Sequence, residues 1–98
     1  MLIRIVKLTI HPDKIEEFKS IYENHMELIR ERKGCEKLEL LQEKGRFNNV
    51  VMTYSYWQSE NDLAAYRDSE LFINVWKTVK PLFCAKAKAW SMERKFEL

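Results

Sequence analysis

The apolar residues of the chain follow two different spacings. Short segments rich in β-branched and aromatic residues predict four strands, at residues 2–10, 35–42, 49–57 and 86–96. Between the first two strands, apolar residues recur at steps of three and four, which predicts an amphipathic helix opened by Pro12 and closed near Gly34. The apolar stripe of this helix consists of Ile15, Phe18, Tyr22, His25, Met26 and Ile29.

The segment between the third and fourth strands predicts a helix that is broken in two. Ser59 opens a capping-box sequence with Asp62, and Ser69 is the N-cap candidate of a second helix that ends before Pro81. The resulting order, β-α-β-β-α-β with a split second helix, is typical of ferredoxin-like α+β domains. We therefore expect a single domain over residues 1–98, with an antiparallel sheet covered by helices.

The predicted strands are apolar on both faces. A single antiparallel sheet with helices on one face should alternate between apolar and polar residues. Residues 50–57 instead carry large or β-branched side chains at both parities, and residues 2–8 also place apolar side chains at both. The second face therefore needs a cover. The simplest cover is the same sheet of another copy, so the pattern predicts a homodimer.

The overall charge is nearly balanced. Seventeen Lys and Arg against fifteen Asp and Glu give a net charge of +2, whereas proteins that bind nucleic acid or a membrane surface usually concentrate basic residues on one face. We expect neither partner. A local excess of basic residues late in the chain predicts either a solvated rim or an attraction for anionic substrates; these residues are Lys77, Lys80, Lys86, Lys88, Arg94 and Lys95.

The sequence contains no motif for a metal or a nucleotide. Cys35 and Cys84 lie far apart and fit no metal or redox spacing, so free buried thiols in a reducing compartment are expected. Charges interrupt the first apolar segment too early for a signal peptide, and no stretch approaches the ~20 apolar residues of a membrane span. These features predict a cytoplasmic protein without a metal site or a Gly-rich phosphate loop.

The second half of the chain resembles the antibiotic biosynthesis monooxygenase family. The pattern is a strand ending in Trp57, a short helix, a Ser-x-x-Phe helix start at Ser69 and an aromatic-rich helix followed by residues 80–83. With the order of elements, the resemblance covers essentially the whole chain. It implies a dimeric α/β barrel with a pocket in each subunit between helices and sheet, and it implies polar groups in that pocket from the third strand.

Known activities of this family suggest two kinds of chemistry. Some members oxygenate quinols or anthrones without a cofactor, and others open haem. The haem-degrading branch carries an Asn on the first strand, a Trp after the third strand and a His on the last helix. Trp57 matches, but no Asn precedes Asn24, and the histidines are His11 and His25. We therefore expect neither haem nor another cofactor.

His25 is the candidate general base. Imidazole titrates near neutral pH, and His25 lies on the helix stripe that should face the pocket. The alternative is an interior histidine that is hydrogen-bonded to a neighbour.

Aromatic residues are the candidates for substrate binding. Trp57 would either wall the pocket or anchor the following helix in the core. Side chains on the short helices would either roof the pocket or belong to the core, and three tyrosines offer hydroxyls to a phenolic substrate. The candidates on the helices are Tyr66, Phe72 and Trp76, and the tyrosines that offer hydroxyls are Tyr22, Tyr54 and Tyr56.

Two functions agree with these features. The first is a small cofactor-independent monooxygenase acting on an aromatic, quinol-like compound. The second is a non-catalytic dimer of the same fold that binds a small aromatic molecule. No residue of the sequence separates these two. The fold group also contains isomerases and sugar mutarotases, which gives a third, enzymatic alternative.

Overall fold

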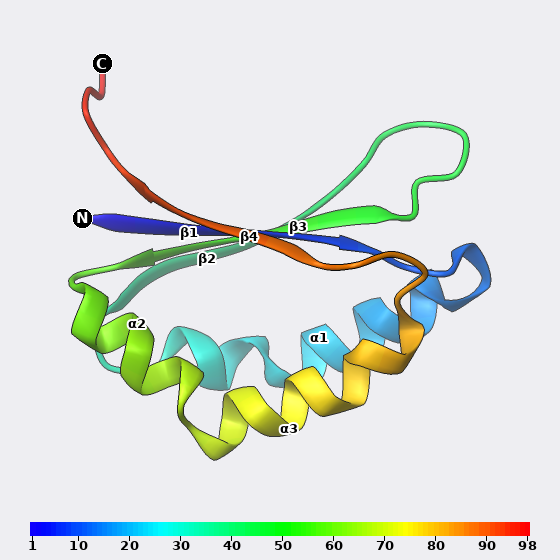
Figure 1. The fold of residues 1–98 in the computed structure, drawn as a ribbon, viewed down its shortest axis with the longest axis horizontal. Coiled ribbons are helices and arrows are strands. Elements are labelled where there is room, and N and C mark those ends of the chain that lie inside the picture. The colour runs from blue at the N-terminus through cyan, green and yellow to red at the C-terminus, as the bar shows by residue number, and fades with distance from the viewer.

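Four antiparallel strands form one sheet, and every helix lies on the same face of it (Figure 1). The computed structural model describes residues 1–98. The strand order is β2-β3-β1-β4, which confirms the predicted ferredoxin-like fold. The elements are β1 (Leu2–Thr9), α1 (Ile15–Arg30), β2 (Cys35–Gln42), β3 (Val50–Trp57), α2 (Glu60–Arg67), α3 (Glu70–Val79) and β4 (Lys88–Glu93), with short 3-10 turns at Pro12–Lys14 and Lys80–Leu82.

Local signals set the ends of the helices as expected. The Ser59 hydroxyl accepts a hydrogen bond from the backbone N–H of Asp62 at 3.1 Å, and the Ser69 hydroxyl accepts one from that of Phe72 at 3.2 Å. Gly34 has a φ of 84° just after α1, a conformation that glycine adopts without strain. The split second helix is therefore produced by two separate caps.

The pairing register decides which side chains face the helices. β1 pairs with β3 through Leu8↔Val51, Val6↔Thr53 and Arg4↔Ser55, so these residues share one face of the sheet. Leu8 and Val51 are buried under the helices, which identifies that face as the inner one. The alternate residues point to the outer face.

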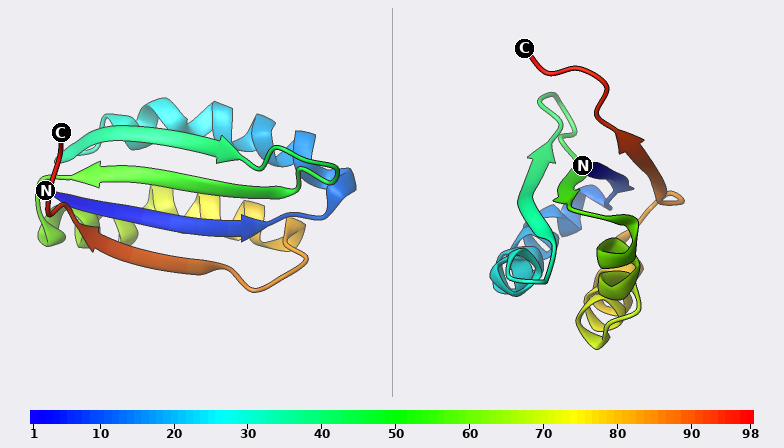
Figure 2. Two further views of the ribbon diagram at one scale, coloured as in Figure 1. Left: turned by 90° about the horizontal axis from the view of Figure 1, so that it is seen from above. Right: turned by 90° about the vertical axis from the view of Figure 1, so that its left-hand side faces the viewer.

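The core lies between the helices and the inner face, in two clusters. Figure 2 shows the two helical arms beneath the sheet, with α1 on one side and α2 and α3 on the other. The larger cluster contains Leu8, Ile10, Ile15, Phe18, Tyr22, Val51, Val79 and Leu82. The smaller one contains Cys35, Trp57 and Leu63.

The outer face of the sheet is uncovered and apolar. No helix crosses it (Figure 1). Ile5 of β1 is paired with Tyr54 of β3 on one side and with Trp90 of β4 on the other, so the three share this face. Trp90 is 40% exposed and Met92 48% exposed. The apolar character predicted for both faces of the sheet is thus present in the structure.

Two expectations differ from the structure. The last strand is shorter than residues 86–96, because Glu93 pairs with Leu2 at the very start of β1, and beyond it no strand remains to pair with. The chain then leaves the sheet (Figure 1), with Phe96 93% exposed. Cys35 is buried as expected, but Cys84 is exposed, because it lies in the connection between Leu82 and β4.

No helix has the length and apolar character needed to cross a membrane.

Candidate functional site

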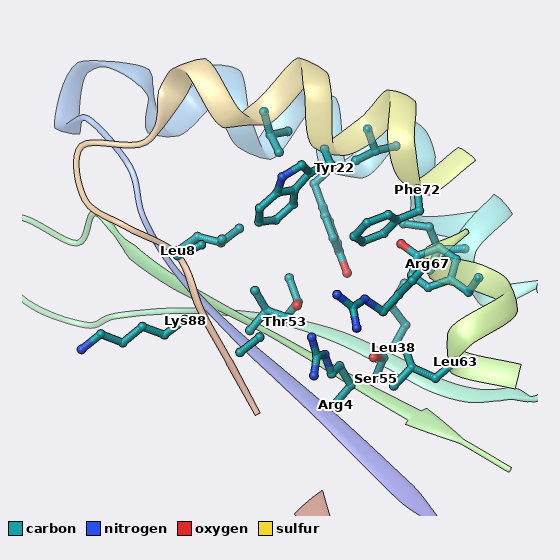
Figure 3. Close-up of a pocket in the computed structure, with 18 of the residues that line it drawn as sticks. Arg4, Leu8, Tyr22, Leu38, Thr53, Ser55, Leu63, Arg67, Phe72 and Lys88 are labelled. Atoms are coloured by element: carbon teal, nitrogen blue, oxygen red, sulfur yellow. The ribbon is translucent and has the colours of Figure 1, made fainter. Parts of the chain in front are cut away.

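A cavity of about 330 Å³ lies between the inner face of the sheet and the helices (Figure 3). All four strands and all three α-helices contribute to its walls, and 14 of its 19 lining residues are hydrophobic. Small-molecule pockets of proteins are typically mostly apolar, with a few polar groups that orient the ligand. This cavity is built in the same way.

The sheet supplies the floor of the cavity. Val6 and Leu8 of β1 line it, and so do Thr53 and Ser55 of β3, because the register places all four on the inner face. The polar groups expected from the third strand are therefore these two hydroxyls. Tyr54 lies at the opposite parity and is not among the lining residues.

Aromatic side chains form one continuous series of ring contacts above this floor. Ring centroids lie 5.1 Å apart for Trp57 and Tyr66, 5.3 Å for Tyr66 and Phe72, and 6.0 Å for Phe72 and Trp76. Tyr66, Phe72 and Trp76 line the cavity. Trp57 does not. It is fully buried behind Tyr66, and its Nε1 donates to Ser55 Oγ at 2.8 Å, which is the geometry of the core anchor.

Tyr22 brings a free hydroxyl into the cavity from α1. The residue is only 7% exposed, and its hydroxyl has no hydrogen-bond partner. Figure 3 shows this hydroxyl pointing away from α1 into the cavity. Burial raises the pKa of the Tyr22 phenol well above its ordinary value, so the hydroxyl stays neutral and can donate a hydrogen bond. A ligand oxygen would satisfy it.

Two arginines extend toward the same end of the cavity. The guanidinium groups of Arg4 on β1 and Arg67 at the end of α2 point toward the Tyr22 hydroxyl (Figure 3). Arg4 Nη1 donates to Ser91 Oγ at 3.1 Å, and neither arginine belongs to a salt bridge. The pKa of Arg4 is lowered by burial and by the charge of Arg67. This end of the cavity is therefore cationic.

Neither arginine is among the site residues predicted from the sequence. One signal was present for Arg4, since it occupies the inward parity of β1 between Leu2 and Val6, where an apolar residue is expected. Arg67 gave no such signal. It follows Tyr66 at the exposed end of a short helix, and only the folded arrangement brings it beside Arg4.

His25 does not line the cavity. The residue is half-buried on α1, and its Nδ1 lies 2.7 Å from the Ile21 carbonyl oxygen. Because a carbonyl can only accept, Nδ1 carries the proton and Nε2 is the nitrogen left to accept one. This bond to a neighbouring turn fits the alternative of an interior histidine.

Other chemistry is sparse. No group of three or more His, Cys, Asp or Glu side chains could hold a metal ion. Burial raises the pKa of the Cys35 thiol, the opposite of what an activated nucleophile needs. The polar chemistry of the cavity is therefore that of hydroxyls and guanidinium groups.

Comparison with protein families gives one match. The family described as Antibiotic biosynthesis monooxygenase matches residues 1–77, which include β1 to β3, α2 and most of α3. A search of curated proteins finds no match.

Solved structures share the fold over the full length. A provisionally named antibiotic biosynthesis monooxygenase from Nitrosomonas europaea is 23% identical with a TM-score of 0.86, covering 98% of this chain and 100% of that one. A conserved protein from Methanosarcina mazei Go1 is 20% identical with a TM-score of 0.88 over 97% and 94% of the two chains. SnoaB, a cofactor-independent oxygenase from Streptomyces nogalater, is 15% identical with a TM-score of 0.85 over 99% and 95%. At these identities the likeness establishes the fold.

Proposed function

Because the chain belongs to the antibiotic biosynthesis monooxygenase family, we propose that it is a cofactor-independent monooxygenase of a quinol-like aromatic compound. The observation that carries the proposal is the cavity, which combines an aromatic roof with an unpartnered Tyr22 hydroxyl and two arginines free of carboxylates. SnoaB, a protein of the same fold, is a cofactor-independent oxygenase.

The chemistry needs little from the protein. An electron-rich quinolate can itself give an electron to dioxygen, so a pocket has to exclude water, favour the ionised form and orient the ring. In overall balance, a quinol and dioxygen give a hydroxyquinone and water. One oxygen atom enters the ring and the other leaves as water, and the substrate supplies all the electrons and protons.

The polar end of the cavity suits the ionised substrate. Positive charges lower the pKa of a phenol bound beside them, so Arg4 and Arg67 would favour the phenolate. The neutral Tyr22 hydroxyl would donate a hydrogen bond to the oxyanion. Arg67 is exposed, so the proton released by the substrate can pass to water at this end of the cavity.

We also propose that the functional unit is a homodimer. The uncovered outer face carries Ile5, Tyr54 and Trp90 side by side, and burial of this apolar surface would stabilise association. Tyr54 then belongs to the subunit interface rather than to the substrate site.

Oxygen uptake tests the proposed activity. With 1,4-dihydroxynaphthalene, the protein should consume one dioxygen per quinol faster than autoxidation and place one ¹⁸O atom from ¹⁸O₂ in the hydroxyquinone. Heat-denatured protein is the control. A panel of quinols that binds without accelerated oxygen consumption would instead establish the non-catalytic binding dimer.

A further inference from the structure

We propose that the cavity selects an aromatic substrate with a carboxylate next to its phenolic hydroxyl, Arg4 and Arg67 binding the carboxylate and Tyr22 the phenolic oxygen. This specificity rests on the proposed function but concerns binding, which can be measured without turnover. It requires the three groups to act on one ligand, and their side chains converge in Figure 3.

The charges at the cavity are unbalanced in a way that an organic anion would correct. Its lining contains two arginines whose guanidinium groups point inward, Arg4 and Arg67, and no Asp or Glu. The salt bridges of the protein all lie elsewhere. Holding two guanidinium groups close together in a partly buried site costs free energy, which a carboxylate between them would offset. Arginine also presents the paired N–H groups that match a carboxylate.

The Tyr22 hydroxyl adds an independent requirement. A buried donor without a partner is unfavourable, and most buried polar groups in proteins are hydrogen-bonded. Tyr22 comes from α1, whereas Arg4 and Arg67 come from β1 and α2, so a single ligand would have to reach all three elements. A phenolic oxygen and a carboxylate at neighbouring positions of one ring would let a single ligand contact all three side chains.

The size of the cavity limits the rest of the ligand. Its volume of about 330 Å³ lies at the lower end of the range for small-molecule pockets, roughly 300–1,000 Å³. The stacked rings of Phe72 and Trp76 favour a flat partner. A compact hydroxyaryl carboxylate of one or two rings fits both conditions.

Two positive charges also match the ionised state that oxygenation requires. Such a substrate carries a carboxylate and, after deprotonation, a phenolate. With a single arginine the carboxylate would cancel the positive charge, whereas two leave one charge to favour the phenolate. The pair of arginines thus explains how the cavity could bind an acid and still promote ionisation of its hydroxyl.

Calorimetric titration of the whole protein with two matched probes tests this specificity. The probes are 1-hydroxy-2-naphthoate and its neutral carboxamide, 1-hydroxy-2-naphthamide, which have the same shape. We expect the carboxylate to bind roughly tenfold or more tightly, because its bonds to guanidinium groups are charge-assisted. Equal affinities for the two probes, or tighter binding of the amide, would overturn the proposal.

Single substitutions separate direct contacts from general attraction. Arg4→Gln and Arg67→Gln should each weaken naphthoate binding roughly tenfold and change amide binding by less than about twofold. Lys88→Gln is the matched control. It removes one positive charge beside the cavity rather than inside it, because Lys88 pairs with Lys7 at the outward parity of the sheet and its side chain points away from the Tyr22 hydroxyl in Figure 3, so naphthoate binding should change by less than about threefold.

Each result has a definite meaning. An equal loss of affinity in all three variants would indicate only long-range attraction and would overturn the assignment of the arginines. Arg67 is exposed at the end of α2, so Arg67→Gln remains informative even where Arg4→Gln disturbs the sheet. Carboxylate-selective binding without oxygen uptake would overturn the proposed oxygenase activity and leave the ligand class in place. Oxygen uptake without carboxylate selectivity would do the reverse.

Discussion

At the scale of single residues, the Tyr22 hydroxyl should contribute to ligand affinity but not to the stability of the free protein. Its hydroxyl is buried without a partner, so Tyr22→Phe should leave the unfolding free energy of the free protein unchanged or raise it by up to about 1 kcal/mol. The same change should weaken 1-hydroxy-2-naphthoate binding roughly fivefold, because a hydrogen bond to the ligand is lost. Urea unfolding and calorimetric titration measure the two effects.

Tyr56→Phe is the control, because Tyr56 lies on the outer face, where it is paired with Ile3. It should change ligand affinity by no more than about twofold. A clear loss of stability in Tyr22→Phe would mean that the hydroxyl has a partner within the protein.

His25 is the second residue whose role can be measured. Because its ring does not line the cavity and its Nδ1 is bound to the Ile21 carbonyl, His25→Ala should lower the melting temperature by a few degrees. Turnover per folded molecule should stay within about threefold. Loss of a general base usually costs about a hundredfold or more, so a loss of that size would restore His25 as the base.

At the scale of elements, Gly34 controls how α1 and β2 meet α2. Its φ of 84° is unfavourable for other residues, and a Cβ at this position would collide with the Asp62 side chain beside the Ser59 cap. Gly34→Ala should therefore destabilise the fold by about 1–3 kcal/mol.

Gly45 provides the comparison for the Gly34 substitution. It lies between β2 and β3, where an added Cβ would meet the Glu43 side chain only at an ordinary distance of 3.7 Å. Gly45→Ala should change the unfolding free energy by less than about 0.5 kcal/mol. Equal effects at Gly34 and Gly45 in chemical unfolding would show that the strain at Gly34 is relieved elsewhere.

The elements themselves were largely predictable because their signals are local. Ser59 and Ser69 cap the two short helices as their sequence contexts indicate. The end of β4 was not predictable from residues 86–96, because it depends on where β1 begins to pair with it. Strand length is set by the partner, and the partner is distant in the sequence.

The same distinction between local signals and distant partners applies to the candidate site. Apolar spacing on α1 and α3 indicated that Tyr22, Phe72 and Trp76 face the sheet, and the structure places all three at the cavity. The cationic end was not predictable, because Arg4 and Arg67 are brought together by folding. Parity along β3 decided which side Tyr54 faces, and a strand that is apolar at both parities does not reveal it.

At the scale of the whole molecule, the uncovered face of the sheet predicts its assembly. Light scattering at micromolar concentration should give about twice the chain mass of 11.9 kDa. Ile5→Lys places a charge at the centre of the outer face and should shift the protein to monomers, because burying an unpaired charge costs far more than the contact gains.

Leu28→Lys is the matched control for assembly. Leu28 is an exposed apolar residue, 54% exposed, but it lies on α1 away from the outer face. This variant should remain a dimer. A monomeric wild-type protein would leave the apolar outer face without a cover and would contradict the proposed assembly.

The three tryptophans occupy three different environments, and this gives the protein built-in optical reporters. Trp57 is fully enclosed, Trp76 lines the cavity, and Trp90 is 40% exposed on the outer face. Trp57 emission should respond chiefly to unfolding, Trp76 emission to a stacked ligand, and Trp90 emission should shift to the blue when a second subunit excludes water. Single Trp→Phe variants would assign these signals, so that folding, ligand binding and association could each be followed by fluorescence.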